Sequence, residues 1–298
     1  MKFGVHLPGW GLWAHNLELF TKTAPLAEEL GYEWITISDH YMEPIAPEPL
    51  PVERHASIEP FTLLGYIAAQ TSRIKIGTCV TPIPMRHPPQ LAKTVAQLDI
   101  LSGGRMMLGV GAGYGPREWK AYSVTGWISD KERVERTEEA LQLMIKMWTE
   151  DRVDFQGKYY RVEGAVLLPK PIQKPYPSLL FGAGGKKMLD LTAKYGNLWL
   201  MSIILVGGLE EFKSRAKYLR KKASEHGRTL KLGVVAPIIE TGVKVDFRVF
   251  ASFDELPKKL EEFREAGCEY ASLAFAPPQK YIDLMKRFQK EIMPSFSN

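Results

Sequence analysis

Residues 75–115 read KIGTCVTPIPMRHPPQLAKTVAQLDILSGGRMMLGVGAGYG, and this stretch decides the fold. A short apolar strand over residues 74–80 runs into a proline-rich loop. A segment with helical spacing of its apolar residues follows, then a Ser-Gly-Gly-Arg turn, then a second apolar strand over 106–111 that ends in glycines. The stretch therefore predicts a β-loop-α-β unit whose strand-end loops are able to hold a ligand.

The same alternation of apolar strands and amphipathic helices extends from this unit to both ends of the chain. The predicted strands are 3–7, 34–38, 74–80, 106–111, 178–181, 198–202, 232–236 and 270–275. The predicted helices are 17–30, 60–71, 89–101, 131–150, 186–194, 209–225, 254–266 and 278–290. Strict alternation implies a parallel sheet with crossover helices. Eight units in 298 residues fit one (β/α)8 TIM barrel over 1–298, with a doubly wound open sheet as the alternative.

Three segments interrupt the alternation and are interpreted as insertions after strands 2, 4 and 7. Residues 42–55 follow the second strand and carry four prolines. Residues 151–177 follow the fourth helix, and their sequence DFQGKYYRVEG alternates about Gly157 like a hairpin. Residues 238–252 form the third predicted insertion.

Composition narrows the classes of partner. The net charge of +5 arises from 39 basic and 34 acidic residues, and the densest basic cluster, 213–222, fits the solvated face of a helix. We therefore expect no nucleic-acid partner. No run of about 18 apolar residues and no signal-peptide pattern is present, so we expect a cytoplasmic protein without membrane contact. Cys79 and Cys268 lack metal-ligand spacing, which predicts reduced thiols and no metal.

Asp39 and His40 follow the second strand directly, in the sequence SDHY. Polar residues just past a barrel strand face the active-site mouth. An aspartate can accept a hydrogen bond from a heteroaromatic ring, and a histidine can transfer a proton near neutral pH. The alternative is a strand-end cap and a structural histidine.

Two glycine-rich strand ends are candidate ligand contacts. Residues 109–115, GVGAGYG, let the backbone approach a bulky ligand, but Tyr114 and Pro116 stand where a dinucleotide fingerprint needs glycine. Residues 181–187, FGAGGKK, predict a phosphate site for a cofactor at a helix N-terminus. The alternative for the second is a glycine-bearing loop with solvated lysines.

Large aromatic residues gather in the predicted loops, where they line either a substrate pocket or local packing. They are Trp10, Trp13, Tyr41, Tyr114, Trp119 and Trp127. The residues that three other enzyme classes need are absent from the sequence. Strand one carries only His6 instead of the HxH pair of a metal amidohydrolase, and strand four ends without the carboxylate that a paired-carboxylate glycosidase would need. The GxSxG elbow of a serine hydrolase is also absent.

Four segments together resemble the bacterial-luciferase-like monooxygenase superfamily. They are FGVHLP (3–8), GYEWITISDHY (31–41), the run 74–115, and FGAGGKKMLDLTAKYGNLWL (181–200). Within the superfamily the chain looks most similar to the branch of F420-dependent oxidoreductases, which includes alcohol and glucose-6-phosphate dehydrogenases. Superfamily members are commonly dimers, so a homodimer is expected.

The resemblance implies a role for each candidate residue. Asp39 becomes a catalytic residue and cofactor contact, and His40 the proton donor or acceptor for substrate. A non-prolyl cis peptide is implied at Cys79–Val80, backing the deazaflavin ring. The implied cofactor contacts also include Thr81, Gly111, Ala112, Gly113, Gly184 and Gly185. Separately from the resemblance, the aromatic residues in the loops predict Trp10, Tyr114 and Trp119 as substrate contacts.

One departure bears on the substrate. The glucose-6-phosphate dehydrogenases carry a catalytic glutamate directly after the second glycine of strand four, and Ala112 stands there in this chain, with Glu118 nearby. We therefore expect an oxidoreductase that transfers a hydride between F420 and a small alcohol or carbonyl compound. The alternatives are an FMN-dependent monooxygenase that uses reduced flavin and O2, and a cofactor-binding protein without catalysis.

Overall fold

The computed structural model describes residues 1–44, 49, 51–123, 125–242 and 249–296. Within these residues eight parallel strands close into a barrel, which confirms the predicted (β/α)8 class. The barrel strands are β1 (Lys2–Leu7), β2 (Trp34–Ile37), β3 (Lys75–Thr78), β5 (Met106–Gly111), β8 (Ser178–Phe181), β9 (Leu198–Ser202), β10 (Lys231–Ile239) and β12 (Tyr270–Ala276). They pair in chain order, β12 pairs with β1, and β9 pairs with β10.

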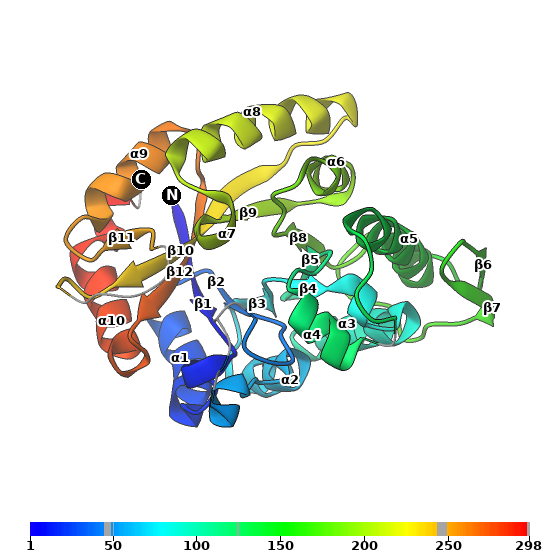
Figure 1. Ribbon diagram of the computed structural model, residues 1–298, viewed down its shortest axis with the longest axis horizontal. Helices are drawn as coiled ribbons and strands as arrows, with labels where there is room; N and C mark the ends of the chain where they lie inside the picture. The colour runs from blue at the N-terminus through cyan, green and yellow to red at the C-terminus, as the bar shows by residue number, and fades with distance from the viewer. Residues whose placement is uncertain (45–48, 50, 124, 243–248, 297–298) are drawn as a thin grey trace.

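Helices surround the barrel on its outside (Figure 1). The main helices are α1 (Leu17–Glu29), α2 (Pro60–Gln70), α3 (Pro88–Leu101), α5 (Asp130–Thr149), α6 (Lys186–Tyr195), α8 (Leu209–Glu225), α9 (Leu256–Glu265) and α10 (Tyr281–Glu291). Every predicted strand and helix boundary lies within three residues of the observed one. None of the described helices is long and apolar enough to cross a bilayer.

Short elements that the sequence did not predict sit in the loops. They are α4 (Pro116–Tyr122), α7 (Ile203–Val206), β4 (Thr81–Pro82), β11 (Ala251–Ser252), and the 3-10 helices Gly11–Trp13, Val52–His55, Ile83–Met85, Pro278–Lys280 and Met293–Phe296. The predicted hairpin is confirmed as the antiparallel pair β6 (Val153–Gln156) and β7 (Arg161–Ala165). It lies at the edge of the molecule beyond α5 (Figure 1).

Two predicted strand ends need correction. The third strand ends at Thr78 rather than at residue 80; pairing resumes at β4, where Thr81 is opposite Val110 of β5. The seventh strand continues through Ile239, because Ile238 and Ile239 pair with β12 and belong to the sheet rather than to an insertion. Of the predicted insertions 42–55 and 238–252, residues 45–48, 50 and 243–248 lie outside the described part.

Side chains along each barrel strand alternate between the helices outside the barrel and the barrel interior. On β1, Phe3 packs against Phe288 of α10, on the outside of the barrel. Because successive residues of a strand face opposite sides, positions 4 and 6 face the barrel interior. The barrel interior has an apolar side, in which Leu180, Leu198 and Leu200 pack with Cys79, Val80, Val235 and Tyr270. A polar side is formed by His6 of β1, Thr36 of β2 and Ser272 of β12, which contact one another. The polar side leads directly to the strand end that carries His40.

Candidate active site

The ends of β3, β5 and β8 pack around one side chain, Val80. The peptide bond between Cys79 and Val80 is cis, as the resemblance implied. A Cβ added to Gly111 would lie 2.5 Å from Val80 Cγ2, and one added to Gly182 would lie 2.8 Å from Val80 Cγ1. These glycines therefore make room first for Val80, a requirement that the sequence did not reveal. Cys79 and Val80 stay half-exposed at this end.

His40 is held by a carboxylate from a different part of the chain. Its Nδ1 lies 3.1 Å from Glu118 Oε2, on the first turn of α4. The other carboxylate oxygen, Oε1, accepts the backbone N–H of Tyr41 at 2.5 Å. Glu118 is only 2% exposed. The structure thus places an acidic group from α4 at His40, whereas Ala112 occupies the end of β5.

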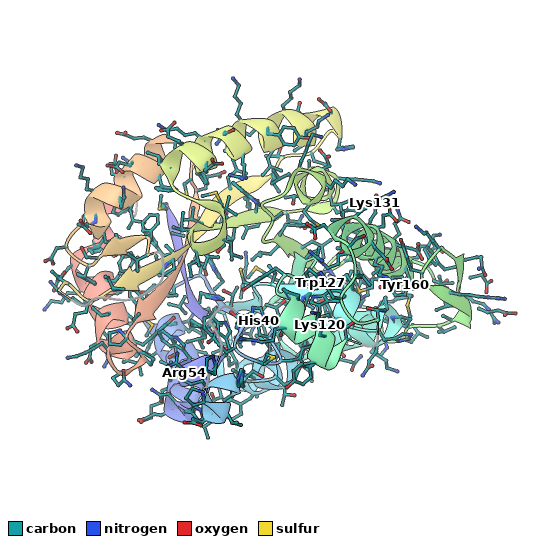
Figure 2. All side chains as sticks on the ribbon, viewed as in Figure 1. His40, Arg54, Lys120, Trp127, Lys131 and Tyr160 are labelled. Atoms are coloured by element: carbon teal, nitrogen blue, oxygen red, sulfur yellow. The ribbon has the colours of Figure 1, made fainter. Side chains whose placement is uncertain are left out.

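Two of the three predicted substrate contacts surround His40. The Tyr114 hydroxyl lies 3.4 Å from His40 Nε2, and burial, with the charges of Glu118 and Glu43, raises the pKa of Tyr114. The Trp10 ring meets the His40 ring edge-on at 6.4 Å. Figure 2 shows His40 near the centre of the molecule, beyond the end of β2. Glu118, Tyr114 and Trp10 can therefore hold the His40 ring in one orientation, in which a ring nitrogen can accept a proton.

Trp119, the third predicted substrate contact, is in a different environment. It is 0% exposed, and a Cβ added to Gly113 would lie 2.7 Å from its indole nitrogen. Its ring packs edge-on against Trp127. The structure therefore places Trp119 beneath the strand-end loop with no accessible surface, because the positive φ of Gly113 folds the loop over the indole.

Asp39 belongs to a buried ion pair. Its two carboxylate oxygens accept from Arg86, at 2.8 Å from Nε and 2.6 Å from the terminal nitrogen, and Asp39 is 1% exposed. Arg86 also contacts Glu59 Oε1 at 3.1 Å and lies over the Phe61 ring. Burial disfavours the charged guanidinium, but the hydrogen bonds and charge of Asp39 outweigh this and raise the pKa of Arg86. Both oxygens of Asp39 therefore accept hydrogen bonds from Arg86, and its role as a catalytic residue and cofactor contact stays a prediction.

A chain of hydrogen bonds fills the polar side of the barrel. His6 contacts Thr36 Oγ1 through Nδ1 and Ser38 Oγ through Nε2, both at 3.1 Å. Thr36 continues to Ser272, which accepts the indole N–H of Trp34. Burial lowers the pKa of His6 to about 4, and His40 contributes in the same direction. His6 is therefore a neutral, fixed support below the residues that follow β2.

This lowered pKa predicts acid-sensitive stability. The unfolded chain binds a proton at His6 below about pH 6.5, whereas the folded chain binds it only near pH 4. The contribution of neutral His6 to the free energy of unfolding is thus fully present above about pH 6.5. It falls by about 3 kcal/mol as the pH drops to about 4. We expect His6→Gln to flatten the dependence of the unfolding free energy on pH in this window. Parallel wild-type and variant curves from urea titrations would contradict it.

The predicted phosphate loop lies between β8 and α6. Gly185 is exposed, and a Cβ added there meets nothing within 4 Å, so an anion has access to the start of the ten-residue helix α6. Gly184 has a different reason to be glycine, since its Cβ would lie 2.8 Å from Val206 Cγ2. Its carbonyl accepts Arg215 Nε at 3.1 Å. Open space at Gly185 fits a phosphate-bearing cofactor.

Thr81 is completely buried, and its hydroxyl donates to Thr78 Oγ1 at 2.9 Å, so any contact with a cofactor would come from its backbone. Ala112 and Gly113 remain half-exposed at the same strand end. In the described part of the chain no three His, Cys, Asp or Glu side chains gather as a possible metal site.

Sequence reasoning missed Arg86, and it noted Glu118 only as lying near Ala112, without a contact to His40. Arg86 pairs with Asp39 across 47 positions, and Glu118 with His40 across 78. In sequence, Glu118 resembles an ordinary acidic residue in the first turn of a helix. No local signal distinguishes either residue from a solvated charge.

Residues 1–255 match the family described as luciferase-like monooxygenase. The chain belongs to this family. The resemblance stated from the sequence is thereby confirmed.

Relatives with both kinds of cofactor are similar to the chain. An FMNH2-dependent dimethylsulfone monooxygenase of Pseudomonas putida is 27% identical over 89% of this chain and 69% of its own length. An F420-dependent glucose-6-phosphate dehydrogenase of Nocardia farcinica is 40% identical over 50% of this chain, which spans less than half of that relative (43%). Family membership therefore leaves both cofactors open.

Solved structures agree on the fold. A monooxygenase from Streptomyces bottropensis superimposes with a TM-score of 0.81 at 22% identity, covering 100% of both chains. An F420-dependent secondary alcohol dehydrogenase, solved with an F420–acetone adduct, has a TM-score of 0.81 at 21% identity over 100% of this chain and 99% of its own. At these identities the likeness supports the barrel alone.

Proposed function

We propose that the protein is an oxidoreductase that transfers a hydride between coenzyme F420 and a small alcohol or carbonyl compound. The observation that carries the proposal is the His40 ring, supported by a buried carboxylate and flanked by Trp10 and Tyr114 at the end of β2. Removing a hydride from an alcohol requires an acceptor for the hydroxyl proton, and an imidazole ring nitrogen is suited to that role. Neighbouring aromatic rings favour an apolar substrate over a sugar phosphate.

The residues at the strand ends fit the cofactor. The half-exposed Cys79–Val80 segment offers a surface for a planar ring, and the open backbone at Gly185 offers N–H groups to a phosphate. Bound F420 would supply the carbon that accepts or donates the hydride. The protein would bind and orient the substrate, and His40 would accept or return the proton.

The second candidate is an FMN-dependent monooxygenase that uses reduced flavin and O2. The alignment with the dimethylsulfone monooxygenase favours it, because it extends over 89% of this chain. The same strand ends would hold FMN. Association as a homodimer and a cytoplasmic location remain predictions.

Titration with each cofactor separates the two candidates. We expect F420 to bind with micromolar or tighter affinity, followed by absorbance, and its visible band to bleach when a secondary alcohol is added. Tight binding of FMN, with oxygen uptake that requires reduced flavin and no bleaching of F420 by any alcohol, would overturn the proposal. Binding of F420 without turnover of alcohols or carbonyl compounds would instead support a binding protein.

A further inference from the structure

The carboxylate of Glu118 contacts two nitrogens, one with each oxygen. Tyr41 donates its backbone N–H to Oε1 at 2.5 Å, and His40 Nδ1 lies 3.1 Å from Oε2. The Glu118 side chain is 3% exposed and that of His40 is 12% exposed, so water does not compete freely for either group. A residue of α4 is thus tied to two consecutive residues that follow β2.

We propose that Glu118 is a positioning residue that fixes the tautomer of His40, with the hydrogen on Nδ1 and the lone pair on Nε2. A carboxylate only accepts hydrogen bonds, so the ring nitrogen that faces it must be the donor. A neutral imidazole carries one hydrogen, which leaves Nε2 as the acceptor. The consequence for catalysis rests on the proposed function; the tautomer itself does not.

The other neighbours of His40 agree with this assignment. The Tyr114 hydroxyl lies 3.4 Å from Nε2 and is suited to donate a weak hydrogen bond to it. Trp10 and Tyr114 meet the ring edge-on, at interplanar angles of 87° and 79°, so both restrict its rotation. Carboxylate, backbone and aromatic contacts together hold the ring in one orientation.

During alcohol oxidation this tautomer determines where the proton goes. The substrate O–H bond breaks and its proton passes to His40 Nε2. The C–H bond would break with its electron pair, F420, when bound, would supply the acceptor for that hydride, and the carbonyl double bond would form. His40 becomes an imidazolium, and its Nδ1–H remains hydrogen-bonded to the negative charge of Glu118, which stabilises it. Carbonyl reduction is the reverse.

Glu118→Gln tests the proposal with little change in shape. A glutamine amide offers one oxygen for the two N–H groups that the carboxylate accepts. The backbone N–H of Tyr41 has no freedom to become an acceptor, so we expect the amide oxygen to face Tyr41 and the NH2 to face His40 Nδ1. The NH2 group needs an acceptor, which moves the hydrogen of His40 to Nε2. The tautomer should reverse.

The readout is the ¹⁵N chemical shift of the His40 ring nitrogens in apo-protein with labelled histidine, followed over a pH series up to the pH at which the shifts show one protonated and one unprotonated nitrogen. The His40→Ala variant identifies the signals. We expect a protonated Nδ1 in the wild type and a protonated Nε2 in Glu118→Gln. In turnover, Glu118→Gln should lower kcat by about 10²-fold or more with little change in KM. Glu132→Gln, which changes a half-buried partner of Arg136 on α5, is the control and should leave shifts and kcat unchanged.

A wild-type His40 with its hydrogen on Nε2 would overturn the proposal, even if Glu118→Gln fails to fold. A reversed tautomer with undiminished kcat would also overturn the positioning role. If the wild-type tautomer is as proposed but the wild-type protein does not turn over F420 with any alcohol or carbonyl compound, the proposed function fails and the tautomer assignment stands.

Discussion

Replacement of His40 by alanine is expected to lower kcat for F420-linked alcohol oxidation by about 10²–10⁴-fold, the usual contribution of a positioned acid or base. The reason is that two polar neighbours of the ring are poorly suited to replace it: burial raises the pKa of the Tyr114 hydroxyl, and Glu118 contacts Nδ1 rather than Nε2. Steady-state absorbance of F420 at saturating cofactor measures the effect.

His226→Ala is the matched control, since this exposed histidine follows α8, away from the strand ends. It should keep full turnover, and both variants should keep wild-type affinity for F420. Turnover above a tenth of wild type in His40→Ala would contradict the proton-transfer role. Normal kcat with weakened F420 binding would instead assign His40 to the cofactor.

Arg86→Met is expected to destabilise the protein by about 3–5 kcal/mol, because it leaves the carboxylate of Asp39 buried without its partner. Burial already raises the pKa of Asp39, against the opposing effect of Arg86. Methionine retains much of the apolar stem that packs near Phe61. Urea unfolding followed by tryptophan fluorescence gives the change in free energy.

A double-mutant cycle separates the ion pair from lost packing. Asp39→Asn combined with Arg86→Met should be less destabilised than the sum of the single variants, by about 1–3 kcal/mol. Arg264→Met is the control; it removes an exposed ion pair with Glu261 and should cost no more than about 1 kcal/mol. Additive effects of the two buried substitutions would show that the pair contributes no coupling.

The barrel is predictable from sequence because each unit carries its own information. Strands such as 106–111 are buried along their whole length, and helices such as α8 place Phe212, Ala216 and Leu219 on one face. A short apolar strand bounded by glycines and a helix of regular period need no knowledge of distant residues. The hairpin about Gly157 is equally local.

The site was only partly predictable, because its polar contacts join distant segments. Position after a strand was enough to select His40. Nothing near Asp39 in sequence indicates that Arg86 will engage both of its oxygens, or that Glu118 will reach His40 from α4. Trp119 shows the opposite error, since an aromatic residue in a loop was expected at a pocket and is buried instead.

The packing of Val80 between Gly111 and Gly182 has a consequence for how this scaffold can diversify. One branched side chain occupies the volume that residues on two adjacent strands would otherwise use. A smaller residue at position 80 would free that volume, so that β5 or β8 could supply the bulk instead. A larger residue at position 111 or 182 is therefore tolerated only if the residue at position 80 is smaller than valine. Mutant libraries that aim to reshape this part of the barrel mouth should vary the three positions together.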